Sequence, residues 1–221
     1  MKTTTILKLN KQIIQCKKCP RLVSYVRMVA EAKVKRYNQE KYWGRPLSGF
    51  GDPKAQLLIV GLAPAAHGGN RTGRMFTGDS SGDWVAKVLF DNGFATKPSS
   101  THINDGFNLI NTYITAAVKC APPDNKPTKD EISTCSEYLE CELHVLTNIK
   151  IIICLGKIAF DAVKRLLEIH QQKFFHGNNF LHDNKMILCC YHPSRQNTQT
   201  GRLKWNQWNE IFAKAKTLLC T

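Results

Sequence analysis

Four cysteines have the residue type and the spacing to hold a metal centre. Cys16 and Cys19 form the motif C-K-K-C near the N-terminus, and Cys120 and Cys135 follow much later with fourteen residues between them. The chain starts without the apolar run of a secretion signal, so we expect metal ligands here rather than disulfide partners. Zinc and iron–sulfur clusters both accept four cysteines, and the spacing by itself leaves both open.

Two segments combine polar and aromatic side chains with tight turns. Residues 61–82 read G-L-A-P-A-A-H-G-G-N-R-T-G-R-M-F-T-G-D-S-S-G, which allows close backbone approach to a ligand but lacks the G-K-[ST] of a P-loop. Within it, Phe76 could stack on a base and Asp79 could position water, although core packing and helix capping explain these residues equally well. Residues 191–203, Y-H-P-S-R-Q-N-T-Q-T-G-R-L, put His192 at the end of an expected strand, before several hydrogen-bond donors.

The elements that must position these residues alternate along the chain. Short apolar runs bounded by turn residues predict buried strands at 56–60, 113–118, 150–155 and 186–191. Amphipathic segments between and around them predict helices at about 21–36, 80–92, 128–146, 157–167 and 205–219. This order predicts an α/β chain with helices on both faces of a mostly parallel sheet, in one domain over residues 1–221.

Polar loops follow three of the expected strands. Because ligands bind beyond the carboxyl ends of parallel strands, we expect the loops that start at 61, 119 and 192 to gather at one edge of the sheet.

Charge is spread unevenly along the chain. The net charge is +14, and residues 1–50 hold 12 basic but only 2 acidic side chains. Such a basic front end is typical of a phosphate-contacting surface or of a solvated face. No stretch approaches the roughly 20 apolar residues that span a bilayer. We therefore expect a cytoplasmic protein, associated with the nucleoid through DNA and without a membrane partner.

Long strings in this chain resemble the uracil-DNA glycosylase superfamily, and most closely its family 5, the type-b enzymes. They are the segment at 61–82, K-C-A-P-P-D-N-K-P-T at 119–128, and H-P-S-R-Q-N-T-Q-T-G-R-L at 192–203; the similarity extends back to C-K-K-C-P-R-L-V. The resemblance implies a three-layer α/β/α sandwich with a central four-stranded, mostly parallel sheet. It implies removal of uracil, and often of other damaged bases, from DNA by a monomer. It also implies a 4Fe-4S cluster on Cys16, Cys19, Cys120 and Cys135.

The same resemblance implies roles for individual residues. Asp79 would orient water or stabilise the sugar cation, His192 would hydrogen-bond near the base O2, and Asn125 would belong to the same catalytic site. Phe76 would stack on the extruded base, and Arg195 would lie with Gln196 where relatives fill the gap that the base leaves. The remaining predicted substrate-binding residues are Gly61, Ala63, Ala65, His67, Asn70 and Asn197.

Two positions depart from other families of the superfamily. Leu62 and Ala63 stand where many members have a polar or acidic residue, and Ala116 stands where relatives carry a base-reading asparagine. A pocket without that amide should reject wrong bases less sharply. We therefore expect hypoxanthine or bulky cytosine adducts to be substrates besides uracil.

Two other classes of function compete with a glycosylase. A zinc-dependent base deaminase is excluded because H-x-E with P-C-x-x-C is absent. A non-enzymatic DNA-binding module, with a basic face held by a metal centre, is separated from an enzyme by one assay, the release of free base.

Overall fold

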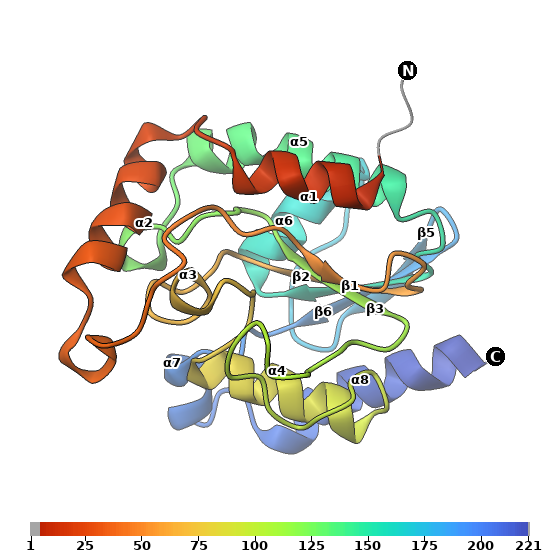
Figure 1. Cartoon of the computed structure of the whole chain (residues 1–221). Coiled ribbons are helices and arrows are strands. Elements are labelled where there is room, and N and C mark those ends of the chain that lie inside the picture. The colour runs from red at the N-terminus through yellow and green to blue at the C-terminus, as the bar shows by residue number, and fades with distance from the viewer. Residues whose placement is uncertain (1–4, 221) are drawn as a thin grey trace.

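A six-stranded sheet runs through the molecule in the order β1-β3-β2-β4-β6-β5. The computed structural model describes residues 5–220, and Figure 1 shows the sheet edge-on between helices. The strands are β1 (Phe50–Gly51), β2 (Leu57–Gly61), β3 (Thr112–Ala116), β4 (Ile151–Leu155), β5 (Asn179–His182) and β6 (Lys185–Cys190).

The four inner strands are the four that the apolar runs predict, and they are parallel. β2 pairs with β3 and β4, and β4 pairs with β6. Every residue of β2, β3 and β4 is buried, as expected for strands covered on both faces. The prediction of a four-stranded sheet is nevertheless wrong in number, because β1 and β5 add antiparallel edges. β1 has two residues and β5 has no fully buried one, so neither leaves an apolar run in the sequence.

Helices cover both faces of the sheet and complete three layers. On one face, Leu58 and Val60 share a core with α1, α2, α5 and α6; on the other, Leu57 and Ile59 share a core with α4 and α8. The helices are α1 (Ile6–Ile14), α2 (Pro20–Ala32), α3 (Gly69–Thr72), α4 (Ser80–Asp91), α5 (Lys129–Val145), α6 (Lys157–Leu166), α7 (Arg195–Gln199) and α8 (Trp205–Cys220), with 3-10 turns η1 (Lys35–Tyr37) and η2 (Pro123–Asn125).

Local sequence explains where several helices begin. Pro20 is the first residue of α2, where its missing N–H costs nothing. Thr128 and Glu131 form a capping box at the start of α5. Asp79 caps α4, with its side chain accepting a hydrogen bond from the Gly82 N–H. This helix therefore begins at a residue that the sequence analysis also predicts for the site.

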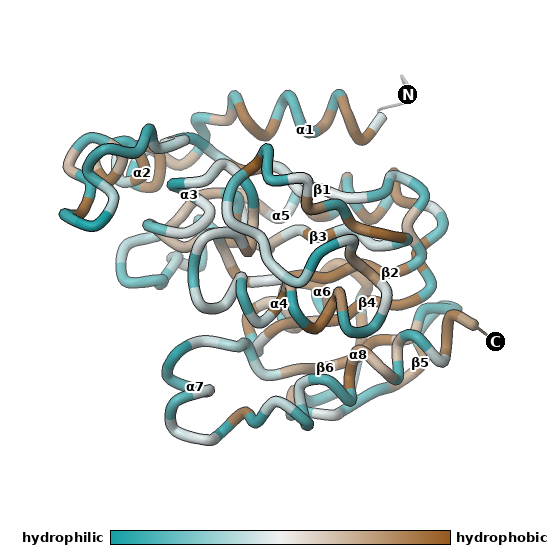
Figure 2. The backbone as a smooth tube through the Cα atoms, turned by 60° about the horizontal axis from the view of Figure 1, so that its bottom comes forward, coloured by the Kyte–Doolittle hydropathy of each residue, from teal (hydrophilic) through white to brown (hydrophobic). Residues whose placement is uncertain are grey.

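The N-terminal helix α1 was not predicted. Its buried side chains are Ile6, Leu9 and Ile13, a helical spacing that the basic character of the segment hides. Figure 2 shows its hydrophobic positions turned towards the sheet and its hydrophilic positions turned outward. Through this face α1 packs against α5, and both helices belong to the layer on this side of the sheet.

Candidate functional site

A cavity of about 1010 Å³ lies among the loops that follow the inner strands. Its walls come from the segment after α2, from the loop between β2 and α4, from the loop at 100–103, and from single residues of η2 and α7. The residues that line it are Val34, Arg36, Tyr37, Glu40, Lys41, Ala65, Ala66, His67, Gly68, Arg71, Thr72, Gly78, Asp79, Ser80, Asp83, Ser100, Thr101, His102, Ile103, Asn125 and Arg195.

The Asp79 carboxylate lies in the cavity wall, at the N-terminus of α4. Its Oδ1 accepts the Gly82 N–H at 2.8 Å. A Cβ placed on Gly68 would lie 1.9 Å from the other oxygen, Oδ2, so only glycine fits beside the carboxylate. Burial raises the pKa of Asp79, against the opposing effect of the Gly82 and Ser81 N–H groups. The site thus holds a partly dehydrated carboxylate in a fixed place, as a group that orients water requires.

Phe76 and His192 lie next to each other, and neither belongs to the lining of the cavity. Their ring centroids are 6.0 Å apart at an interplanar angle of 35°. The Phe76 ring covers the end of β2, because a Cβ on Gly61 would come within 2.6 Å of it. Phe76 itself has a φ of 50°, a left-handed conformation that a bulky side chain rarely adopts and that is typical of functional sites.

The His192 imidazole is uncharged at neutral pH. Burial lowers its pKa to about 4. A neutral imidazole keeps one N–H donor and can stabilise a developing anion without carrying a charge beforehand.

The loop that begins at His192 is fastened to the start of α4. The Arg195 Nε donates to the Ser80 Oγ at 3.3 Å, and the Ser81 Oγ donates to the Pro193 carbonyl at 3.1 Å. The Asn197 Nδ2 donates to the His192 carbonyl at 2.8 Å. Arg195 therefore reaches the cavity as predicted, whereas Asn197 holds the backbone of His192 and does not line the cavity.

The other predicted site residues also fall into two groups, those that line the cavity and those that do not. Ala65, His67 and Asn125 line the cavity. Ala63 packs against the core of the α1–α5 layer instead. Asn70 is fully buried and donates its Nδ2 to the Val26 carbonyl of α2 at 3.2 Å, so it ties the loop to a helix and lies outside the cavity lining.

Sequence reasoning missed several residues of the cavity wall. Arg71 and Asp83 line it together with Tyr37 and Ile103. Asp83 stands four residues after Asp79 on α4, a spacing that puts both carboxylates on one helix face and could have been noticed. No sequence pattern marks Tyr37 and Ile103 as site residues, because both lie outside the motifs.

The basic N-terminal region borders this cavity. Arg36 and Lys41 line it from the segment after α2, and Arg195 of α7 also lines it. A hollow that holds a carboxylate, with an aromatic ring and a neutral imidazole beside it and cations at its border, can take a flat heterocycle attached to a polyanion. It can also stabilise opposite charges on the two sides of a breaking bond.

The four predicted metal-binding cysteines belong to or pack against the core on the α1–α5 face of the sheet. Burial raises the pKa of the Cys120 thiol, and the charges of Cys135, Cys16 and Cys19 raise it further. Cys120 and Cys135 are buried, and Cys16 and Cys19 are half-buried. All nine cysteines of the chain are free. Within residues 5–220, no three His, Cys, Asp or Glu side chains are arranged to hold a metal ion.

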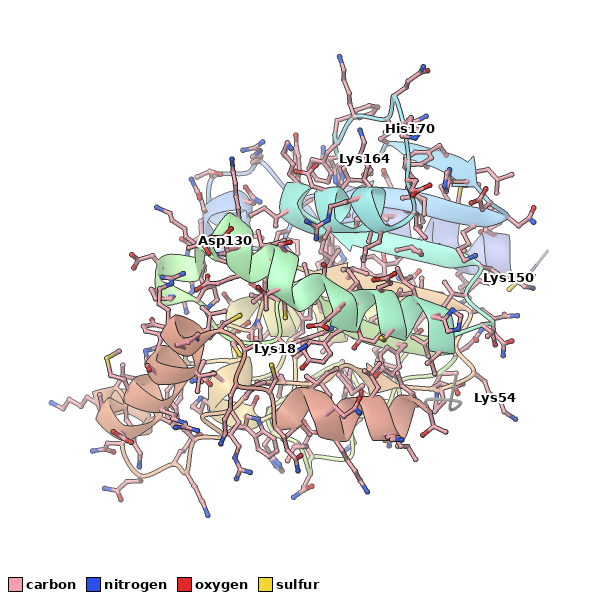
Figure 3. The ribbon with its side chains drawn as sticks, turned by 90° about the horizontal axis from the view of Figure 1, so that it is seen from above. Lys18, Lys54, Asp130, Lys150, Lys164 and His170 are labelled. Carbon is pink, nitrogen blue, oxygen red and sulfur yellow. The ribbon has the colours of Figure 1, made fainter. Side chains whose placement is uncertain are left out.

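The surroundings of these thiols are polar on the outer side. Lys18, between Cys16 and Cys19, forms an ion pair with Glu137 of α5 and lies over the Tyr138 ring at 5.3 Å. Figure 3 looks down on this layer and shows Lys18 between the N-terminal helices and α5. The Lys119 N–H donates to the Cys135 Sγ at 3.3 Å. Four cysteine thiols are the ligand type that zinc and iron–sulfur centres both accept, and these four come from the ends of α1 and α2, from the loop after β3 and from α5.

Among residues 5–220, no helix has the length and the apolar character needed to cross a membrane.

Comparison with known proteins identifies the family of the chain. Residues 48–216 match the uracil DNA glycosylase superfamily. The type-5 uracil-DNA glycosylase of Thermus thermophilus is 44% identical over 92% of this chain and 93% of its own. Those of Mycobacterium leprae (45%, over 97% and 96%) and Pyrobaculum aerophilum (43%, over 92% and 89%) are similarly close. This chain belongs to the uracil DNA glycosylase superfamily, and within it to the type-5 family.

Proposed function

We propose that this protein is a uracil-DNA glycosylase, a hydrolase that cuts the N-glycosidic bond of uracil in DNA and so starts base excision repair. The observation that carries the proposal is the Asp79 carboxylate in the wall of a cavity, at the start of the helix to which the loop after His192 is hydrogen-bonded. The bond lies inside the stack of a duplex, so the nucleotide must first turn out into the cavity. Arg36, Lys41 and Arg195 stand where they can contact the phosphates that remain outside.

The chemical step follows from the positions of three side chains. Phe76 stacks on the extruded base. The neutral His192 donates its N–H near the base O2 and stabilises the negative charge that the leaving base acquires. Asp79 orients the attacking water or stabilises the positive charge on the sugar. Asn125 lies in the same lining and completes the proposed catalytic set.

The proposed specificity is broad. Ala116 ends β3 directly opposite Gly61 of β2, and it belongs to the core on which Phe76 packs. A methyl group at this position offers no hydrogen bond to the edge of a base, so it does not penalise a base with a different edge. We propose that hypoxanthine or a bulky cytosine adduct such as ethenocytosine is released as well as uracil.

An excision assay tests activity and breadth together. Oligonucleotides that carry uracil, hypoxanthine, ethenocytosine or, as the control, thymine are incubated with the protein, and free base is measured by chromatography. We expect release of uracil and of at least one other lesion, and no release of thymine. Uracil release alone would contradict the broad specificity. Binding of all four DNAs without any release would favour the DNA-binding module instead.

We also propose that Cys16, Cys19, Cys120 and Cys135 hold a 4Fe-4S cluster. Four thiols from three segments that are distant in sequence gather in one region, and burial raises the pKa of Cys135 to about 11. Metal coordination supplies the positive charge that such buried thiolates lack. The centre would be structural, because it lies on the α1–α5 layer and its cysteines are absent from the cavity lining.

Replacing Cys120 with alanine should therefore remove the brown colour and most of the folded protein. The reason is that the centre joins α1 and α2 to β3, and its binding energy is folding energy. Iron analysis, visible absorption and the yield of folded protein measure the effect. Cys141→Ala is the matched control, because Cys141 is an exposed thiol on the same helix as Cys135. A colourless wild type with stoichiometric zinc would overturn the iron assignment.

A further inference from the structure

Gly78, the residue before Asp79, is hydrogen-bonded through its backbone to two other residues of the cavity wall. Its N–H donates to the Ser100 carbonyl at 3.1 Å. Its own carbonyl accepts a hydrogen bond from the Arg71 guanidinium at 2.8 Å. A Cβ at this position would come within 2.4 Å of the same guanidinium nitrogen. The backbone that leads into the Asp79 carboxylate therefore rests directly on Arg71.

Arg71 joins this backbone to the segment after α2, which contains Tyr37 and Glu40. Only 8% of its surface is exposed. Its Nε donates to the His67 carbonyl at 2.8 Å, and its Nη1 forms an ion pair with Glu40. Its guanidinium also lies over the Tyr37 ring, 3.8 Å from the centroid. A planar group with five donors can make these contacts at once, which the single ammonium of lysine cannot.

We infer that Arg71 is a positioning residue for base release: it fixes the Gly78 carbonyl, and through it the place of Asp79, relative to the wall formed by Tyr37 and Glu40. The inference rests on the proposed function, since it assigns Arg71 to the same reaction. Arg71 acts through Asp79, and nothing requires it to touch the reacting atoms.

The charge of Arg71 also acts on Asp79. Two charged groups act on the carboxylate, Asp83 on α4 and Arg71 on α3. The other titratable residues of the cavity wall are Arg36, Tyr37, Glu40, Lys41, His67, His102 and Arg195. Asp83 raises the pKa of Asp79 and Arg71 lowers it. Loss of the guanidinium charge therefore raises that pKa further, so the carboxylate becomes protonated at a higher pH.

Two substitutions separate position from charge. Arg71→Met removes the hydrogen bonds and the charge. We expect the single-turnover rate of uracil release to fall about 100-fold, as for a misplaced catalytic group, with little change in affinity for the DNA. The acidic limb of the pH–rate profile should move to higher pH. Arg71→Lys keeps the positive charge but loses the guanidinium that makes several hydrogen bonds at once. The rate of uracil release should therefore fall, while the acidic limb of the pH–rate profile stays at the same pH.

Arg74→Met is the control for loss of a buried arginine in the same loop. Arg74 is 6% exposed. Its Nη2 donates to both Asp105 carboxylate oxygens and to the Ser100 Oγ, and its Nε donates to the Thr77 Oγ1, but none of its donors reaches the Gly78 carbonyl. This variant should lose thermal stability without moving the acidic limb. A carbon NMR titration of the Asp79 carboxyl in wild type and Arg71→Met compares the pKa of this group without any reaction. The effect of Arg71 on Asp79 can therefore be tested even if the protein does not release uracil.

The inference is overturned by a folded Arg71→Met protein with the wild-type rate and limb, or by an Arg71→Lys protein with the wild-type rate. The second result decides the matter even if the methionine variant does not fold.

Discussion

Replacing Asp79 with asparagine should slow uracil release by about 10²–10⁴-fold without unfolding the protein. The carboxylate has two tasks, because it faces the cavity and its Oδ1 also caps α4 through the Gly82 N–H. Asparagine caps helices as well as aspartate does. The substitution therefore removes the negative charge and keeps the cap. Single-turnover rates and thermal unfolding measure the two tasks separately.

Asp79→Ala is the matched comparison. It removes both the charge and the cap, so it should show the same loss of rate together with a loss of stability of about 1 kcal/mol. If the asparagine variant keeps a rate within a few-fold of wild type, Asp79 is a helix cap and the catalytic role assigned to it is wrong.

Gly68→Ala should reduce activity about as strongly as a direct change at the carboxylate. The added Cβ would lie 1.9 Å from the Asp79 Oδ2 and 2.8 Å from its Cγ, so the side chain must leave its place. A displacement of about 1 Å at a catalytic group costs about 100-fold in rate. The φ of Gly68 is −100°, outside the left-handed region, so the demand for glycine here comes from Asp79. Single-turnover kinetics on a uracil-containing oligonucleotide measure the loss.

Two controls define this effect. In Gly177→Ala nothing lies within 4 Å of the new Cβ, although φ is +85°. That variant should lose about 1 kcal/mol of stability and keep its rate per folded molecule. The double variant Gly68→Ala with Asp79→Asn should be little slower than Asp79→Asn alone, because both changes act on one group. Additive losses would show that Gly68 acts by another route.

Features that depend on residues close together in the sequence could be predicted without the structure. The inner strands are uninterrupted apolar runs, and the start of α5 is set by Thr128 and Glu131, three residues apart. The sequence predicts Asp79 both as a helix cap and as a site residue. The structure shows the cap and places the residue in the cavity wall, and its catalytic role stays a prediction. The two edge strands escaped because pairing with a neighbour, and not their own composition, makes them strands. The prediction of one domain and of a monomer stays a prediction.

Amino-acid sequence by itself determined the local elements, the motif that holds Asp79 and the family resemblance, because each depends on neighbours along the chain. Only tertiary structure decided that Asn70 turns to Val26, 44 residues earlier, or that Arg71 pairs with Glu40, 31 residues away. Only it decided that the rings of Phe76 and His192 meet. These contacts follow from the order in which the strands pair and from the packing of loops at their ends, and no local pattern of residues encodes either one.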